Sequence, residues 1–187
     1  MSISILRPLR FLLPFLLLIA VVEAPSFGQE RGNEEARVSP NAAVSQTIGT
    51  TEVRLTYGRP KMKGRTIFAE DGLVPHGEVW RTGANEAATI SFSSDVIIEG
   101  ESLSAGTYSL YTIPGPETWT IIFNNVANQW GTNYNADEDA LRVEVSPESA
   151  PTREMMTFLF TDVTKTAGTC VLHWADTRVP FEIEVAE

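Results

Sequence analysis

The sequence predicts an all-β protein: a single antiparallel β-sandwich, jelly-roll-like, with two long structured loops and little helix beyond its N-terminal segment. Short segments alternate between apolar and polar residues with a period of two, as half-buried strands do. These segments recur about every eight to twelve residues, and turn-forming Gly, Pro, Asn and Asp separate them. Outside the N-terminal segment, no stretch shows the helical apolar period.

The composition favours one folded domain and makes some partners poor candidates. The chain has 187 residues and 43% are hydrophobic, which suits a packed core in one domain. Its formal net charge is −10. Because such a charge repels phosphate backbones and anionic lipid, neither nucleic acid nor a membrane surface is an expected partner. The sequence does not indicate an oligomeric state.

The N-terminal segment is organised like a secretory signal peptide. Arg7 and Arg10 give it a positive start, and the residues 11–22 that follow are apolar apart from one proline. This apolar run is about a dozen residues long, too short to span a bilayer comfortably, so a retained anchor is less favoured. Small residues around Gly28 provide a cleavage site.

These features set the expected domain boundaries. Residues 1–28 are predicted to be a signal peptide, so we expect an exported protein, periplasmic or extracellular, with no membrane span after cleavage. Residues 29–38 are polar and predict a flexible leader. The β-sandwich domain is predicted to occupy residues 39–187.

The predicted strands follow from the alternation. Segments 44–48 and 53–57 flank Gly49-Thr50 and predict an antiparallel hairpin. Residues 58–77 contain many Gly and Pro and predict a structured crossing loop, and residues 125–139 predict a second long loop. The other predicted strands are 79–82, 88–92, 96–98, 102–103, 107–113, 119–124, 141–145, 155–163, 169–174 and 179–185.

Pro180 lies near the start of the last predicted strand. Because proline cannot donate a ladder hydrogen bond, it predicts an edge strand there.

The first candidate for binding chemistry is a group of four cations in the crossing loop. They are Arg59, Lys61, Lys63 and Arg65. If this segment is extended, their two-residue spacing directs all four to one side. Such a patch could hold a carboxylate or phosphate, which Arg can bind through two hydrogen bonds. The alternative is a solvated loop whose charges pair with Glu70, Asp71 or the acidic surface.

The second candidate is the string Trp80-Arg81-Thr82-Gly83-Ala84-Asn85-Glu86. An aromatic ring beside amide and charged groups is typical of small-ligand and sugar sites, which favours Trp80, Arg81, Asn85 and Glu86 as ligand-binding residues. Equally, Trp80 could belong to the core, with an internal Arg81–Glu86 salt bridge holding the loop.

The third candidate is the Asn-rich loop, in which Asn124, Trp130 and Tyr134 again combine aromatic rings with amides. These residues could form the other wall of the same cleft. In the alternative interpretation, the loop is structural and its side chains bond to their own backbone.

Catalytic and metal sites are weakly indicated. His76 lies beside Glu78 in the crossing loop, and Glu86 is a further possible acid or base. His173 is expected to be a half-exposed strand residue, and Cys170 an inert buried one. No hydrolytic triad, metal site or cofactor is predicted.

Six strings of this sequence resemble a known family. They are Tyr57-Gly58-Arg59-Pro60, Lys63-Gly64-Arg65, Leu73-Val74-Pro75, Trp80 to Glu86, Ala105-Gly106-Thr107-Tyr108 and Trp130-Gly131. Together they resemble the exported bacterial proteins catalogued as domain of unknown function 2911, over residues 38–185. The resemblance implies the compartment and the fold, and no activity. It also implies Tyr at the position of His76, which weakens a catalytic role for that histidine.

The leading hypothesis is a non-catalytic module that binds a small polar ligand or glycan in a loop-built cleft at one end of the sandwich. The candidate ligand-binding residues are Arg59, Lys63, Arg65, Trp80, Arg81, Asn85, Glu86, Asn124, Trp130 and Tyr134. One alternative is a periplasmic hydrolase that uses Glu86 or Glu78 as acid or base, with or without His76. The other is a structural envelope-interaction module.

Overall fold

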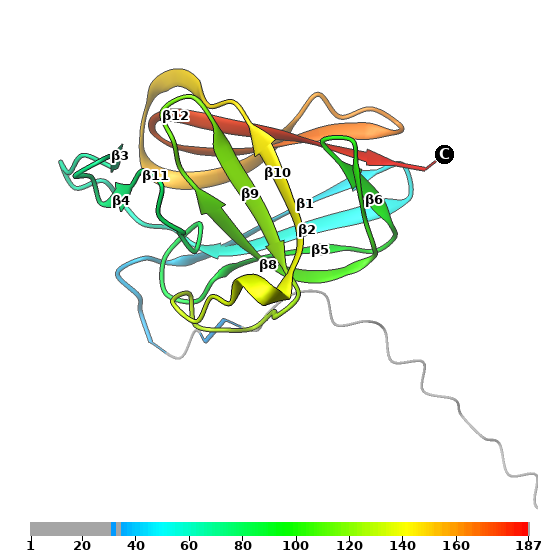
Figure 1. Ribbon diagram of the computed structural model, residues 1–187, viewed down its shortest axis with the longest axis horizontal. Coiled ribbons are helices and arrows are strands. Elements are labelled where there is room, and N and C mark those ends of the chain that lie inside the picture. The colour runs from blue at the N-terminus through cyan, green and yellow to red at the C-terminus, as the bar shows by residue number, and fades with distance from the viewer. Residues whose placement is uncertain (1–30, 33–34, 187) are drawn as a thin grey trace, which may run out of the picture.

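The computed structural model describes residues 31–32 and 35–186, which form an antiparallel β-sandwich (Figure 1). One sheet has six strands in the order β1-β2-β5-β8-β9-β10, and the other has four in the order β11-β12-β6-β7. The predicted all-β sandwich is therefore confirmed. The predicted signal peptide lies outside the described residues.

The strands of the six-stranded sheet lie side by side in chain order, and each pairs antiparallel with the next one in the sheet. Its strands are β1 (Asn41–Ile48), β2 (Thr51–Gly58), β5 (Ala88–Phe92), β8 (Gly106–Ile113), β9 (Trp119–Asn124) and β10 (Asp139–Val145). The predicted hairpin at its edge is present, with Ile48 paired to Thr51 across a two-residue turn. Gly49 has φ of 58° in this turn, a conformation that glycine adopts at little cost.

The four-stranded sheet differs from the prediction in its longest strand. Its strands are β6 (Val96–Ile98), β7 (Glu101–Leu103), β11 (Glu148–Thr161) and β12 (Ala167–Val185). The two strands predicted at 169–174 and 179–185 are thus one. The chain bends within it at Ala175, whose φ is 53°. Such an irregularity breaks the alternation, which is why the sequence suggested two strands.

The predicted edge position of Pro180 was wrong, because β12 lies between β11 and β6. Its pairing with β11 ends at Arg178, and its pairing with β6 begins at Ile183. Pro180 falls in the interval where the strand changes partner. A missing backbone N–H is tolerated there as it is at an edge.

The crossing loop contains a short parallel pair, β3 (Phe68–Ala69) and β4 (Val74–Pro75), instead of a longer element. The strand predicted at 79–82 is reduced to one bridge between Trp80 and Thr112. It ends because Thr82 has φ of 52°, outside the extended region.

The core between the sheets is rich in aromatic side chains. Its largest fully buried members include Trp119, Trp174, Phe92, Phe123 and Phe181. Cys170 is also fully buried, as predicted, and burial raises the pKa of its thiol. This thiol is consequently a packing group.

His173 is buried, which corrects the prediction of a half-exposed residue. Its Nδ1 accepts a hydrogen bond from Arg153 Nε at 3.2 Å, and its Nε2 lies 3.0 Å from the Pro151 carbonyl oxygen. This arrangement fits a neutral ring protonated on Nε2. Both contacts come from β11, the neighbouring strand of the same sheet, whose pairing with β12 the alternation alone does not reveal.

Burial lowers the pKa of His173, which makes stability depend on pH. The unfolded chain takes up a proton on this histidine near its ordinary pKa of about 6.5, while the folded chain resists. Folding stability should therefore fall as pH drops through about 6.5, and His173→Gln should remove this component. Urea unfolding at several pH values measures it, and an unchanged pH profile in the variant would contradict it.

Candidate functional site

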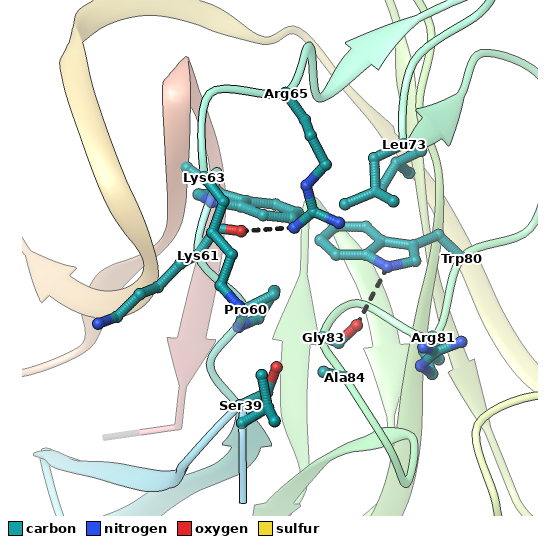
Figure 2. Close-up of a pocket in the computed structure, with 13 residues that line it drawn as sticks. Ser39, Pro60, Lys61, Lys63, Arg65, Leu73, Trp80, Arg81, Gly83 and Ala84 are labelled. Carbon is teal, nitrogen blue, oxygen red and sulfur yellow. Dashed lines mark hydrogen bonds between the residues drawn. The ribbon is translucent and has the colours of Figure 1, made fainter.

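A hollow of about 310 Å³ opens between the crossing loop, the turn at Gly83 and residues 38–39 (Figure 2). It is lined by Val38, Ser39, Pro60, Lys61, Lys63, Arg65, Leu73, Val74, Trp80, Arg81, Gly83, Ala84 and Trp174. Its volume is at the lower end of the range for small-molecule sites, which is roughly 300–1,000 Å³. Of the ten predicted ligand-binding residues, four line it: Lys63, Arg65, Trp80 and Arg81.

The hollow has a cationic lining in an acidic protein. Lys61, Lys63, Arg65 and Arg81 contribute to it, and none of its lining residues in the described chain is Asp or Glu. The whole sequence carries 14 Lys and Arg against 24 Asp and Glu. A concave site lined by one sign of charge concentrates ligands of the opposite sign.

Arg65 is held in place by the backbone of its own loop. Its Nε donates to the Met62 carbonyl at 2.9 Å, and its Nη2 donates to the Lys61 carbonyl at 2.7 Å. Figure 2 shows the guanidinium group beside the indole of Trp80. The guanidinium of this exposed arginine is thus held in one orientation by the protein itself, and such preorganisation generally lowers the entropy cost of binding.

Trp80 belongs to the core, as the alternative interpretation states, and its ring also lines the hollow. Its ring is stacked with Trp174 at a centroid distance of 5.8 Å. Its Nε1 donates to the Gly83 carbonyl at 3.2 Å, which ties the ring to the turn that follows it. Trp80 is 8% exposed, so only a small part of it is accessible from the hollow.

The turn after Trp80 has an unusual backbone. Thr82 and Asn85 have φ of 52° and 68°, and the β-branched Thr82 is fully buried. The Thr82 hydroxyl donates to the Trp80 carbonyl at 3.2 Å. Backbone strain of this kind persists only where the surroundings determine it. The main constraint is close packing on Gly58, where a Cβ atom would overlap the Ala84 carbonyl oxygen.

Two arginines that precede the sandwich bind this turn, and both of them contact the Glu86 carboxylate. Arg31 is buried and donates to the carbonyl oxygens of Ala87 at 2.9 Å, Ala84 at 3.0 Å and Glu86 at 3.1 Å. Its Nη2 lies 3.2 Å from Glu86 Oε2. Arg37 donates to both carboxylate oxygens of Glu86, at 2.6 and 2.9 Å. We call Arg31, Arg37 and Glu86 the arginine clamp.

The arginine clamp fixes the ionisation of Glu86. The hydrogen bond from Arg37 is the main cause that lowers the pKa of this carboxyl group, and Arg31 adds to it. Burial lowers the pKa of Arg31 to about 10, which leaves it charged at neutral pH. The salt bridge considered between Arg81 and Glu86 is not formed, because Glu86 faces the two N-terminal arginines instead.

Sequence reasoning missed Arg31 and Arg37, which lie in the segment 29–38 that was predicted to be a flexible leader. They occur in a polar stretch with no apolar period, so nothing local indicates their contacts. Their partner is about fifty residues further along the chain. The one indication in the sequence is Glu86, an acidic residue at the end of the Trp80 string that requires a cationic partner if it is buried.

Asn124 has a structural role in the second long loop. It is fully buried, and its Nδ2 donates to the Asn135 carbonyl at 2.9 Å and to Asp139 Oδ1 at 2.8 Å. Its Oδ1 accepts from the Val126 N–H at 3.1 Å. These hydrogen bonds agree with the alternative interpretation, in which side chains of the Asn-rich loop bond to the backbone of the same loop.

Tyr134 and Trp130 lie in the same loop and do not line the hollow. The Tyr134 hydroxyl donates to Asp139 Oδ2 at 2.6 Å and accepts from Arg142 Nη2 at 2.7 Å. Trp130 is 53% exposed, and its backbone forms a bridge with Glu86. The Asn-rich loop and the Trp80 string are therefore neighbours in the structure, but the side chains of Trp130 and Tyr134 do not line the hollow.

Arg59 does not lie with the other three cations of the group predicted in the crossing loop. Its Nε donates to the Met156 carbonyl at 2.9 Å and its Nη2 to Thr157 Oγ1 at 2.7 Å, so it ties β2 to β11. The other three cations line the hollow. The segment is not extended throughout, because Lys63 and Gly64 have φ of 51° and 71°. The four side chains consequently do not share one side in the way that the spacing suggested.

The catalytic candidates are not brought together. His76 lines a separate hollow of about 200 Å³ with Phe68 and Trp119, and Glu78 is exposed. Glu86 is in the arginine clamp. Within residues 31–32 and 35–186, no group of three or more His, Cys, Asp or Glu side chains is placed to hold a metal ion. The same residues include no helix that could cross a membrane.

Comparison with protein families matches residues 39–183 to DUF2911, whose members are described as proteins of unknown function. The chain belongs to the DUF2911 family. This confirms the resemblance drawn from its sequence strings. Comparisons with curated proteins and with solved structures gave no match.

In this DUF2911 protein, three of the strings that carry the resemblance meet at one junction. Gly58 packs on the Ala84 carbonyl, and a Cβ atom on Gly131 would overlap the Arg81 side chain. The Gly131 N–H also donates to the Asn85 carbonyl at 3.2 Å. Lys63 is fixed nearby through its own N–H, which donates to Glu154 Oε1 at 3.0 Å. Two glycines thus allow the close approach of backbone that builds the junction.

Two buried hydroxyls in this domain are unsatisfied among the described residues, Thr56 Oγ1 and Tyr111 Oη, and the second lies beneath the second loop. Tyr57 Oη is also buried but accepts the Phe158 N–H at 3.0 Å. Because an unpaired buried polar group costs free energy, Tyr111→Phe should leave the free energy of unfolding unchanged or raise it by about 1 kcal/mol. Tyr57→Phe should lower it by about 1–2 kcal/mol, since it orphans an N–H.

Chemical denaturation of both variants measures this contrast. A Tyr111→Phe variant as destabilised as Tyr57→Phe would contradict it, and would mean that the Tyr111 hydroxyl has a partner in solution.

Proposed function

We propose that this DUF2911 domain is an exported, non-catalytic module that binds a small polar ligand in the hollow beside Trp80. The observation that supports it most is the combination of Trp80 with the pre-oriented guanidinium of Arg65 in one concave site. An apolar wall with a few fixed polar groups is the usual composition of a small-ligand site. Export is proposed from the N-terminal segment, whose charge and apolar run are those of a signal peptide.

The hydrolase alternative has less support. A general acid or base needs a pKa near the working pH and reach to a substrate. The pKa of Glu86 is lowered, its oxygens are occupied by Arg31 and Arg37, and it does not line the hollow. Glu78 is exposed on the crossing loop.

A ligand screen on the purified protein tests the proposal. Thermal shift against sugars, nucleosides, carboxylates and phosphates would find ligands, and two variants would locate them. Leu73→Trp should abolish binding, because Leu73 lines the hollow and is 45% exposed, so the larger ring can fill the space. Trp130→Ala should not, because Trp130 lies outside it. The proposal would be contradicted if the screen found no ligand, or if binding of the ligands found were lost only in Trp130→Ala.

The export proposal has its own measurement. The mass of the protein recovered from outside the cytoplasm should correspond to a chain that begins at Gln29. That product retains Arg31 and Arg37, and with them the arginine clamp. A full-length chain recovered only inside the cell would contradict export.

A further inference from the structure

We infer that the ligand of this hollow is a small organic anion, a carboxylate or a phosphate monoester carried on an apolar body. This inference rests on the proposed function and narrows it to one chemical class. Three features of the molecule support it: the unused hydrogen-bond donors of Arg65, the apolar residues beside them and the distribution of charge over the surface.

Arg65 presents a free edge of its guanidinium group. A guanidinium has five N–H donors in a fixed planar arrangement. The backbone carbonyls of Met62 and Lys61 take one donor each from Nε and Nη2. Nη1 and the second hydrogen of Nη2 have no hydrogen-bond acceptor among the described residues. This edge matches the two oxygens of a carboxylate or phosphate, which arginine binds in a bidentate manner.

The residues beside this edge are apolar. Figure 2 shows Leu73 and the Trp80 indole next to the Arg65 guanidinium. Val38, Val74 and Trp174 also line the hollow. Leu73 and Val38 are 45% and 80% exposed, so inorganic phosphate alone would leave them in contact with water, whereas an anion with a ring or short hydrocarbon would cover them.

The charge distribution distinguishes this hollow from two other depressions in the described part of the chain. Glu99, Glu144, Glu148 and Glu182 line a shallower depression elsewhere, and Asp95 and Glu184 line a further one. Anions are repelled from those surfaces and from most of a protein of net charge −10. The cationic hollow is therefore the place at which an anion would be concentrated. A neutral sugar gains nothing from this field.

Isothermal titration of the purified protein with five simple probes tests the inference. Benzoate and phenyl phosphate combine an anion with a ring, benzyl alcohol is the neutral counterpart, inorganic phosphate lacks the ring, and methyl glucoside represents a neutral sugar. We expect the two aromatic anions to bind, more weakly at high salt, and the other three to bind at least about tenfold more weakly. The stronger of the two identifies the anionic group.

Variants connect that binding to Arg65. Arg65→Gln should weaken the aromatic anion by about tenfold or more, because it removes a charged hydrogen-bond pair. Arg65→Lys should recover part of the loss, since it restores charge without the two-pronged edge. Lys63→Gln should weaken binding less. Lys165→Gln, an exposed lysine in the distant β11–β12 hairpin, is the charge-matched control and should have no effect.

The outcomes separate this inference from the proposed function. Suppose that methyl glucoside or benzyl alcohol binds, that Leu73→Trp abolishes this binding and that Arg65→Gln leaves it intact. This result would overturn the assignment of an anionic ligand, while the proposal that the hollow is a ligand site would stand. Aromatic anions that bind equally to wild type and Arg65→Gln would overturn that assignment as well. Absence of binding by every probe would count against both.

Discussion

Replacing Glu86 by Ala is expected to lower the free energy of unfolding by about 3 kcal/mol, the largest single-residue effect outside the aromatic core. The carboxylate is paired with Arg31 at 3.2 Å and with Arg37 at 2.6 Å. The Arg31 side chain is only 3% exposed, so removal of Glu86 leaves a buried cation without its counter-charge. Urea denaturation of purified wild type and variant at neutral pH measures the difference.

Two comparisons make this result specific. Glu148→Ala removes an exposed partner that lies 3.7 Å from Arg178, and it should cost less than about 1 kcal/mol. The lowered pKa of Glu86 stabilises the fold above its unfolded pKa, and this contribution is lost as pH falls through the folded one. Glu86→Gln should therefore show a smaller loss of stability on acidification than wild type. Equal costs for Glu86→Ala and Glu148→Ala would mean that the arginine clamp does not stabilise the fold.

Gly58→Ala is expected to lower the free energy of unfolding by about 2–3 kcal/mol, although alanine is the smallest possible addition. The new Cβ atom would overlap the Ala84 carbonyl oxygen and come within 3.3 Å of Arg31 Nη2. The obstacle is mainly backbone in a strained turn, so it cannot swing aside as a flexible side chain would. The Ala84 carbonyl also accepts a hydrogen bond from Arg31, and this bond would be displaced with it.

Gly64→Ala is the matched control for Gly58. Nothing lies within 4 Å of a Cβ atom on Gly64, and its φ is 71°. The cost is then only that of a left-handed alanine, about 1 kcal/mol. Thermal or chemical unfolding of both variants gives the comparison. A Gly58→Ala variant no less stable than Gly64→Ala would show that the junction tolerates separation of β2 from the Gly83 turn.

Much of the fold could be predicted because alternation is a local property. The hairpin of β1 and β2 follows from residues 44–57 alone, with a glycine at the turn. β12 could not be predicted as one strand, since Ala175 disturbs its alternation and Pro180 is acceptable only because the strand changes partner there. Partner exchange depends on the other strands and has no signature in the residue itself.

The candidate site could be predicted only in part, for the same reason. Residue type drew attention to four residues that line the hollow: Lys63, Arg65, Trp80 and Arg81. It did not show that Arg59 is bonded to β11 or that Asn124 holds its own loop. The same residue types serve binding and structure, and only the position of their partners distinguishes the two uses.

An NMR titration with phenyl phosphate tests the central claim, that the hollow beside Trp80 is the binding site of this DUF2911 protein. The indole N–H of Trp80 is bonded to the Gly83 carbonyl within the lining, so its resonance reports directly on the hollow. We predict saturable shifts of that resonance and of the Lys63, Leu73 and Gly83 amides. Shifts confined to the loop around Trp130, or none at all, would contradict the claim.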